Sequence, residues 1–259
     1  MTCIRPITAK FDELKRKNEC ALIIYLTAGY PSLKESLDHI LTVADSGADI
    51  IEIGVPFSDP VADGPIIQYS SQIALSNSVT LHDIIDNIKE IKINVPLVIM
   101  SYLNPVLAYG KERFFKSIST GGISGSIIPD IPIEESSEWI SLSKMYDIDS
   151  IFLVAPTTSE ERIKAVVQGS SGFIYCVTVT GTTGIRDQLP SELSGFIKNV
   201  RCLADKPIAV GFGISTVAQI KLLSKDVDGV IIGSRVIEAV RKGEDLVELI
   251  KKFKKATRR

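Results

Sequence analysis

The chain has 259 residues, a length typical of one (β/α)8 barrel and long enough to bury most of its apolar surface in a single core. It carries 29 Lys and Arg residues against 31 Asp and Glu residues, so it has no excess positive charge to bind nucleic acid or an anionic membrane. We therefore expect one domain over residues 1–259, with a small-molecule substrate and with neither a nucleic acid nor a membrane as partner.

The first predicted element is a helix over residues 9–18, which we expect to cover the floor of a barrel. Its charged residues exclude a secretory signal and a membrane span. Eight short segments rich in β-branched or aromatic residues follow, each with a polar loop and a helical stretch after it. This alternation predicts an α/β fold with a parallel sheet covered by helices. The eight predicted strands are 22–26, 50–55, 97–102, 125–129, 150–154, 173–177, 207–210 and 229–232.

Several helix boundaries can be predicted from local signals. Ser32 with Glu35, and Thr158 with Glu161, have the spacing of capping boxes, and Gly47 stands where a left-handed residue ends the first of these helices. No G-x-G-x-x-G or Walker A pattern is present, so an open doubly wound sheet is disfavoured. Eight units in this length favour closure into a (β/α)8 TIM barrel with an extra N-terminal helix.

Glu52 is the first candidate catalytic residue. In the second predicted strand, Ile51, Ile53 and Val55 alternate with it, so placing the apolar residues against the helices turns Glu52 into the barrel. A buried glutamate can belong to a satisfied polar network in the core. Glu52, however, lies near the carboxyl end of its strand, where this fold places catalysis, and burial raises a carboxyl pKa toward the range useful for proton transfer.

Asp63 is the second candidate, in the loop 56–65 that follows the same strand. Asp63, Gly64 and Pro65 also have the pattern of a helix cap followed by an early-helix proline. The loop nevertheless overhangs the same barrel mouth as Glu52, so we expect the two carboxyl groups to serve one site. Asp59 and Pro60 are better explained as a turn.

Glycines at the ends of two adjacent strands predict a phosphate site. The seventh strand leads into residues 211–215, and the eighth leads into Gly233 and Ser234 at the start of a short helix. Glycines let backbone amides approach an anion, and a helix N-terminus adds partial positive charge. These glycines could instead serve only tight turns, but their repetition at two neighbouring strand ends favours phosphate. The segment 180–184 could supply another wall.

The cysteines and histidines are not expected to take part in the chemistry. The four cysteines include no C-x-x-C pair, which argues against a disulfide framework or a thiolate zinc site and indicates a reducing compartment. His39 and His82 lie in stretches predicted as polar helix faces. We expect no metal, no Ser-His or Cys-His nucleophile, and a solvated helix end for the basic residues at 251–259.

The motifs around these residues resemble the tryptophan synthase α subunit family, from Phe11 to the final helix. The continuous stretch 51–65, IEIGVPFSDPVADGP, carries most of the likeness. The matching segments are Asn104-Pro105, 129–132, 182–184 and 211–215. The sequence differs from the usual family pattern at two places. Tyr25 stands where the family often has phenylalanine, and residues 178–180, Thr-Val-Thr, are not the family's commonest sequence at that point.

The resemblance implies aldol cleavage of indole-3-glycerol phosphate to indole and glyceraldehyde 3-phosphate. Glu52 would protonate the indole ring carbon and assist deprotonation of the glycerol hydroxyl, and Asp63 would bind the indole N–H. The implied indole slot contains Tyr25, Met100, Tyr102, Phe173, Tyr175, Val177 and Phe212, although one or two of them could be ordinary core. The implied phosphate site contains Thr183, Gly184, Gly213, Ile214, Gly233 and Ser234.

The resemblance also implies a partner: a β subunit that contains pyridoxal phosphate, in an α₂β₂ assembly, with no cofactor in this chain. Loops after strands two, three, four and six would contact it, and residues 178–189 would form a lid. The expected location is the cytoplasm, or the plastid stroma for an organelle-encoded gene. Alternatives are another phosphate-binding barrel of aromatic amino-acid biosynthesis, a free-standing indole-releasing lyase, and an inactive subunit that activates its partner.

Overall fold

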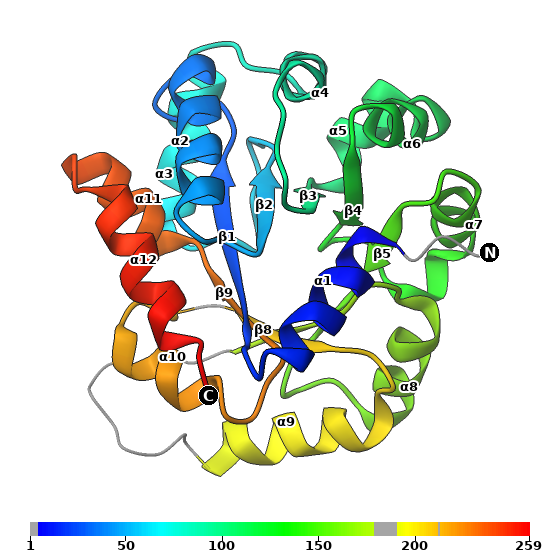
Figure 1. The fold of residues 1–259 in the computed structure, drawn as a ribbon. Helices are drawn as coiled ribbons and strands as arrows, with labels where there is room; N and C mark the ends of the chain where they lie inside the picture. Colours follow the sequence, from blue (N-terminus) through cyan, green and yellow to red (C-terminus); the bar gives the residue numbers. More distant parts are fainter. Residues whose placement is uncertain (1–4, 179–190, 212) are drawn as a thin grey trace.

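A parallel sheet curved into a barrel forms the centre of the molecule, with helices around it (Figure 1). The computed structural model describes residues 5–178, 191–211 and 213–259. Within these residues the strand order is β5-β4-β3-β2-β1-β9-β8-β7-β6. The strands are β1 (Ala21–Thr27), β2 (Ile50–Gly54), β3 (Leu97–Met100), β4 (Ile123–Ile127), β5 (Asp149–Ile151), β6 (Leu153–Val154), β7 (Ile174–Val177), β8 (Ile208–Gly211) and β9 (Gly229–Ile232).

The barrel closes through the fifth predicted strand, which is interrupted once. β5 pairs with β4, β6 pairs with β7, and the single residue Phe152 separates the two halves. The Tyr175 backbone N–H donates to the carbonyl of Phe152 at 3.1 Å, so pairing continues across the interruption. The predicted TIM barrel is confirmed, with eight strand positions in nine pieces among the described residues.

The helices cover the outside of the barrel, and one covers its floor. They are α1 (Pro6–Arg16), α2 (Leu33–Asp45), α3 (Pro65–Ser76), α4 (Leu81–Glu90), α5 (Leu103–Tyr109), α6 (Lys111–Thr120), η1 (Ile133–Glu135), α7 (Ser137–Met145), α8 (Glu160–Gly169), α9 (Ser191–Leu203), α10 (Val217–Leu223), α11 (Ser234–Lys242) and α12 (Leu246–Ala256). In the described part of the chain, no helix has both the length and the apolar character needed to cross a bilayer.

The floor helix α1 begins earlier than predicted. Pro6 occupies its first position, where the fixed φ of proline suits a helix start, so the helix runs over 6–16 and not 9–18. Its buried residues Ile7, Phe11 and Leu14 face the barrel. Ile7 reaches the interior, because a Cβ placed on Gly125 of β4 would lie 2.8 Å from the Ile7 Cδ1 atom.

Local helix signals were partly correct. The Ser32 hydroxyl caps α2 by accepting from the Glu35 N–H, and Gly47 has a φ of +114° just after that helix, as predicted. The capping box itself is only half formed, because the Glu35 carboxylate accepts from the Ser32 hydroxyl. The prediction at Thr158 is wrong by one residue. Ser159 is the cap of α8 and accepts from the Arg162 N–H, while the Thr158 hydroxyl accepts from the Ala155 N–H.

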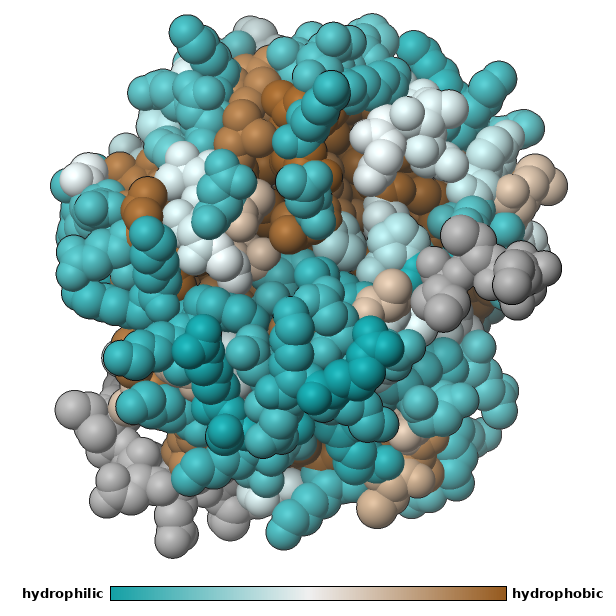
Figure 2. All heavy atoms as spheres, in the orientation of Figure 1, coloured by the Kyte–Doolittle hydropathy of each residue, from teal (hydrophilic) through white to brown (hydrophobic). Residues whose placement is uncertain are grey.

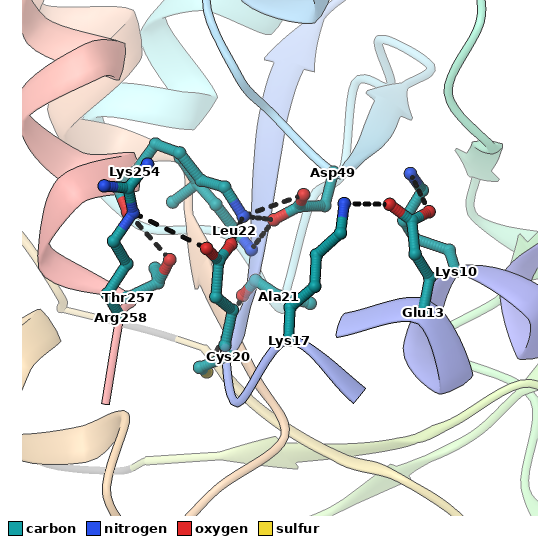
Figure 3. Close-up of polar contacts among 11 residues, drawn as sticks. Lys10, Glu13, Lys17, Cys20, Ala21, Leu22, Asp49, Lys254, Thr257 and Arg258 are labelled. Atoms are coloured by element: carbon teal, nitrogen blue, oxygen red, sulfur yellow. Dashed lines mark hydrogen bonds and ion pairs between the residues drawn. The ribbon is translucent and has the colours of Figure 1, made fainter. Parts of the chain in front are cut away.

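The C-terminal helix is joined to the barrel floor by an ion cluster (Figure 3). The Lys254 ammonium contacts the carboxylates of Asp49 at 2.9 Å and Glu19 at 2.8 Å, and Asp49 accepts the Leu22 N–H. Lys254 is only 19% exposed, so the expected solvated end is wrong at this position. The Lys254 hydrogen bond lowers the pKa of Glu19, and burial raises the pKa of Asp49. The cluster fixes the starts of β1 and β2 against α12.

The surface on the floor side is mixed (Figure 2). Hydrophilic residues cover most of its lower half, and hydrophobic residues show in the upper half, where Figure 1 places β2, β3 and α4. Ile91, Ile93 and Val95, between α4 and β3, are partly buried against the core. The opposite end of the barrel, at the carboxyl ends of the strands, holds the candidate site.

Candidate active site

Strand register turns Glu52 into the barrel. Glu52 pairs in register with Tyr25 on β1 and with Val98 on β3. Its neighbours Ile51 and Ile53 lie on the other face of β2 because strand side chains alternate. Glu52 is 1% exposed and lines a cavity at the mouth of the barrel. The predicted inward orientation is therefore observed.

The cavity has a volume of about 530 Å³ and joins residues from distant parts of the chain. Its walls come from the carboxyl ends of the strands and from the starts of α3 and α11. It brings together the predicted Glu52, Asp63, Tyr25, Met100, Tyr175, Gly213, Ile214, Gly233 and Ser234. Such a concave space with a few polar groups in apolar walls is typical of a small-molecule site.

Burial makes Glu52 a proton donor at neutral pH. Loss of solvation, and secondarily the negative charge of Asp63, raise the pKa of Glu52 to about 8. Its Oε2 atom is buried and has no hydrogen-bond partner among the described residues. A protonated carboxyl with one unpaired oxygen can give its proton to a bound molecule.

Asp63 reaches the same cavity from the loop between β2 and α3. Gly64, and not Asp63, is the N-cap of α3, with Pro65 at the first helical position. The helix-cap reading of Asp63 is therefore wrong. Burial raises the pKa of Asp63 to about 6, and a hydrogen bond from Tyr102 acts in the opposite direction. Asp63 is thus ionised at a pH where Glu52 is still protonated.

Tyr102 positions Asp63 and is not among the residues that line the cavity. Its hydroxyl donates to the Asp63 Oδ2 atom at 3.2 Å and accepts from the Ala62 N–H at 2.9 Å. Phe57 stacks on its ring, with centroids 5.1 Å apart. Tyr102 therefore contacts the loop 56–65 at Phe57, Ala62 and Asp63. The prediction of Tyr102 as an indole contact did not include this positioning role.

The opposite side of the cavity presents backbone groups. Gly213 has a φ of +76°, and Gly233 caps the N-terminus of α11 without a side-chain hydrogen bond. With Ile214 and Ser234 they line the cavity. Free amides at a helix N-terminus favour an anion. Of the other predicted contacts, Thr183, Gly184 and Phe212 lie outside the described residues.

Two predicted indole contacts lie elsewhere. Phe173 is fully buried and packs on Phe11 of the floor helix, with ring centroids 5.7 Å apart. Phe173 is two residues before Tyr175 and points to the same side of the strand. Phe173 lies nearer the floor, however, and belongs to the barrel core. Val177 lines a separate space of about 370 Å³ with Phe152 and Ile133.

Sequence reasoning also missed cavity residues. Those absent from the predicted set are Gly64, Pro65, Ile67, Thr178 and Ile231. Ile231 could have been found, because it lies on β9 two residues before the predicted Gly233, and side chains two residues apart on a strand point to the same side. The contribution of Ile67 could not have been predicted, because it depends on where α3 packs over the mouth of the barrel.

The histidines lie away from the cavity. His82 is exposed on α4, as predicted, with its Nε2 atom 3.4 Å from Asp86. His39 is half-buried on α2 near Glu35 and Asp38, and burial lowers its pKa. The cysteines Cys20, Cys176 and Cys202 are free. Over residues 5–178, 191–211 and 213–259, no group of three or more His, Cys, Asp or Glu residues could hold a metal ion.

Comparisons with known proteins agree with this geometry. The family model for the tryptophan synthase alpha chain matches residues 11–258. The alpha chain of Alkaliphilus metalliredigens is 45% identical over 256 residues, covering 96% of each chain. That of Caldanaerobacter subterraneus subsp. tengcongensis is 42% identical over 250 residues, covering 96% of this chain and 95% of the relative.

Solved structures give the same result. A structure of Mycobacterium tuberculosis tryptophan synthase superposes with a TM-score of 0.93 at 35% identity, covering 99% of this chain and 100% of that chain. The tryptophan synthase alpha subunit of Legionella pneumophila superposes with a TM-score of 0.89 at 29% identity, covering 98% and 99%. By sequence and fold, this chain belongs to the tryptophan synthase alpha chain family.

Proposed function

We propose that this chain performs the family reaction, cleavage of indole-3-glycerol phosphate to indole and glyceraldehyde 3-phosphate, in L-tryptophan biosynthesis, with Glu52 and Asp63 as its catalytic residues. One observation carries the assignment of roles. A buried carboxyl with a pKa of about 8 and a second carboxyl with a pKa of about 6 line one cavity. Two carboxyl groups whose pKa values are moved apart can act as acid and as stabilising anion at the same pH.

In the first step, protonated Glu52 gives its proton to the indole ring carbon that bears the glycerol chain. The ring becomes positively charged at nitrogen, and ionised Asp63 accepts a hydrogen bond from the ring N–H and stabilises that charge. An aromatic carbon leaves poorly until it is protonated, so this step prepares the bond for cleavage.

In the second step, the Glu52 carboxylate takes the proton from the glycerol hydroxyl next to the ring. The carbonyl of glyceraldehyde 3-phosphate forms, the carbon–carbon bond breaks, and its electron pair returns to the ring and neutralises the nitrogen. Glu52 is protonated again at the end. Backbone amides of Gly213, Gly233 and Ser234 hold the phosphate throughout. These steps use acid–base chemistry alone, and we propose that this chain needs no cofactor.

We propose that the chain, one domain over residues 1–259, works with a β subunit in an α₂β₂ assembly, as membership of the tryptophan synthase alpha chain family implies. Pyridoxal phosphate belongs to that partner, which joins the released indole to serine. The free thiols of Cys20, Cys176 and Cys202 fit a reducing location, the cytoplasm or, for an organelle-encoded gene, the plastid stroma.

The direct test of the function is to incubate the purified chain with indole-3-glycerol phosphate and to follow indole, with and without a β subunit. We expect slow release of indole alone and marked activation by the partner. Equal rates in both assays would instead support a free-standing lyase. No indole in either assay would contradict the proposed function.

The pH dependence of kcat/KM is expected to be bell-shaped. Activity requires ionised Asp63 and protonated Glu52, so it rises with a limb near pH 6 and falls with a limb near pH 8. Tyr102→Phe removes a hydrogen bond to the Asp63 carboxylate, which raises its pKa and moves only the acid limb upward. Tyr146→Phe, on the surface, is the matched control. An unchanged acid limb in the Tyr102 variant would show that this tyrosine does not tune Asp63.

A further inference from the structure

The Tyr25 side chain lines the cavity. Its ring fits against two glycines, Gly54 on β2 and Gly233 at the start of α11. A Cβ on Gly54 would lie 2.0 Å from the Tyr25 hydroxyl oxygen, and one on Gly233 would lie 3.2 Å from the ring. Gly54 follows Glu52 by two residues, and Gly233 belongs to the proposed phosphate site. The tyrosine side chain therefore extends from Gly233 at the start of α11, against its Cβ and ring, to Gly54 on β2, against its hydroxyl.

A line of buried hydroxyl groups fixes the phenol. The Thr27 hydroxyl donates to the Tyr25 hydroxyl at 3.4 Å and accepts a hydrogen bond from the Ser70 hydroxyl at 2.6 Å. The Ser70 Oγ atom also lies 2.8 Å from the carbonyl oxygen of Ile67. Thr27 and Ser70 are at most 1% exposed, and Tyr25 is 5% exposed. Because Thr27 supplies the hydrogen of its bond to Tyr25, the phenol's own hydrogen is available to another acceptor.

The acceptor must come from the part of the substrate beside Tyr25. With the phosphate at Gly233 and the ring beside Glu52, the three-carbon glycerol chain passes this wall. That chain carries hydroxyl groups, which accept hydrogen bonds. Burial, together with the nearby charges of Asp63 and Glu52, raises the pKa of Tyr25, so the phenol stays neutral and keeps its proton.

We propose that the Tyr25 hydroxyl donates a hydrogen bond to a glycerol hydroxyl of the substrate and thereby selects phosphorylated indoles with a hydroxylated chain, with Thr27 as its positioning residue. This inference rests on the proposed function. A site built to bond a hydroxyl discriminates against analogues without it, because its polar group is then left unpaired.

The test compares two ligands on Tyr25→Phe. Indole-3-glycerol phosphate has the chain hydroxyls, and indole-3-propanol phosphate lacks them. Dissociation constants are measured by calorimetry, with the Glu52→Gln background used for the substrate so that it is not consumed. We expect Tyr25→Phe to weaken binding of the hydroxylated ligand roughly 3–10-fold, the range of one net hydrogen bond, and the analogue less than about 2-fold. Equal weakening of both ligands, or of neither, overturns the proposal.

Thr27 provides the control for positioning. Thr27→Val removes the hydroxyl at nearly constant shape, whereas Thr27→Ser retains it. We expect Thr27→Val to lose part of the discrimination between the two ligands and Thr27→Ser to keep it. In the Tyr25→Phe background, Thr27→Val should cause no further loss of discrimination. Loss in both Thr27 variants would indicate a packing effect only. If the wild-type protein forms indole but the variants discriminate between the two ligands as wild type does, only this inference is contradicted. If the wild-type protein forms no indole, the proposed function itself is contradicted.

Discussion

Replacing Glu52 with glutamine is expected to lower kcat for indole release by a factor of about 10²–10⁴. Glutamine has the shape of the protonated glutamic acid but cannot give or take the proton, and the proposed mechanism uses that proton in both steps. Steady-state assays with saturating indole-3-glycerol phosphate measure the effect, and binding of indole-3-propanol phosphate should change little. Near-normal turnover would remove Glu52 from the mechanism.

The same variant provides a control against unfolding, because it should be more stable than wild type above neutral pH. The pKa of Glu52 is about 8 in the folded chain and 4.5 ordinarily, so between these values the folded state holds a proton that the unfolded chain has lost. Wild-type stability therefore falls as pH rises through this range, by an amount on the order of a few kcal/mol. Glu52→Gln removes this dependence. Denaturant unfolding at pH 5 and at pH 8.5 should show a difference between the proteins that grows with pH.

Asp63→Asn is expected to lower kcat/KM by about 10²–10³, the scale of removing one preorganised electrostatic group from a water-excluded site. The neutral amide can still contact a ring N–H but cannot balance the positive charge formed on ring protonation. The acid limb of the pH profile should disappear in this variant, since no group with a pKa of about 6 remains to be ionised.

Asp86→Asn, an exposed carboxylate paired with Lys89 on α4, is the matched control for the loss of one negative charge. Its profile should retain both limbs. Should Asp63→Asn keep both its rate and its acid limb, the stabilising role would belong to another group.

Much of the site could be predicted because it follows from local rules. The alternation of Ile51, Glu52 and Ile53 fixed the inward side of a buried strand, and the barrel architecture placed ligands at the carboxyl ends of strands. The same logic identified Gly213 and Gly233 by their position after the last two strands. Each conclusion needs only the strand period and the strand order.

The errors have a common physical cause, which is contact between residues distant in sequence. Lys254 was expected in solvent, but it meets Asp49, 205 residues earlier, when α12 folds against the floor. Phe173 shares the inward face with Tyr175, and only the arrival of Phe11 from α1 assigns it to the core. The role of Tyr102 depends on the loop residue Asp63, 39 positions away.

The interruption of the fifth strand at Phe152 was likewise not predictable from composition. Ile151, Phe152, Leu153 and Val154 form one uninterrupted apolar run, and the break reflects the change of partner from β4 to β7 during closure of the barrel. The one-residue error at Thr158 arose because two neighbouring hydroxyl residues can each cap a helix, and only the backbone path selects Ser159.

A crystal structure of the Glu52→Gln protein with indole-3-glycerol phosphate tests the central claim most directly. We predict that the phosphate oxygens accept hydrogen bonds of about 2.7–3.2 Å from the amides of Gly213, Gly233 or Ser234. The ring carbon that bears the chain should lie about 3–3.5 Å from the side-chain end of position 52, with the ring N–H directed at Asp63. A substrate bound with its phosphate away from α11, or with position 52 out of reach of that carbon, would contradict the account.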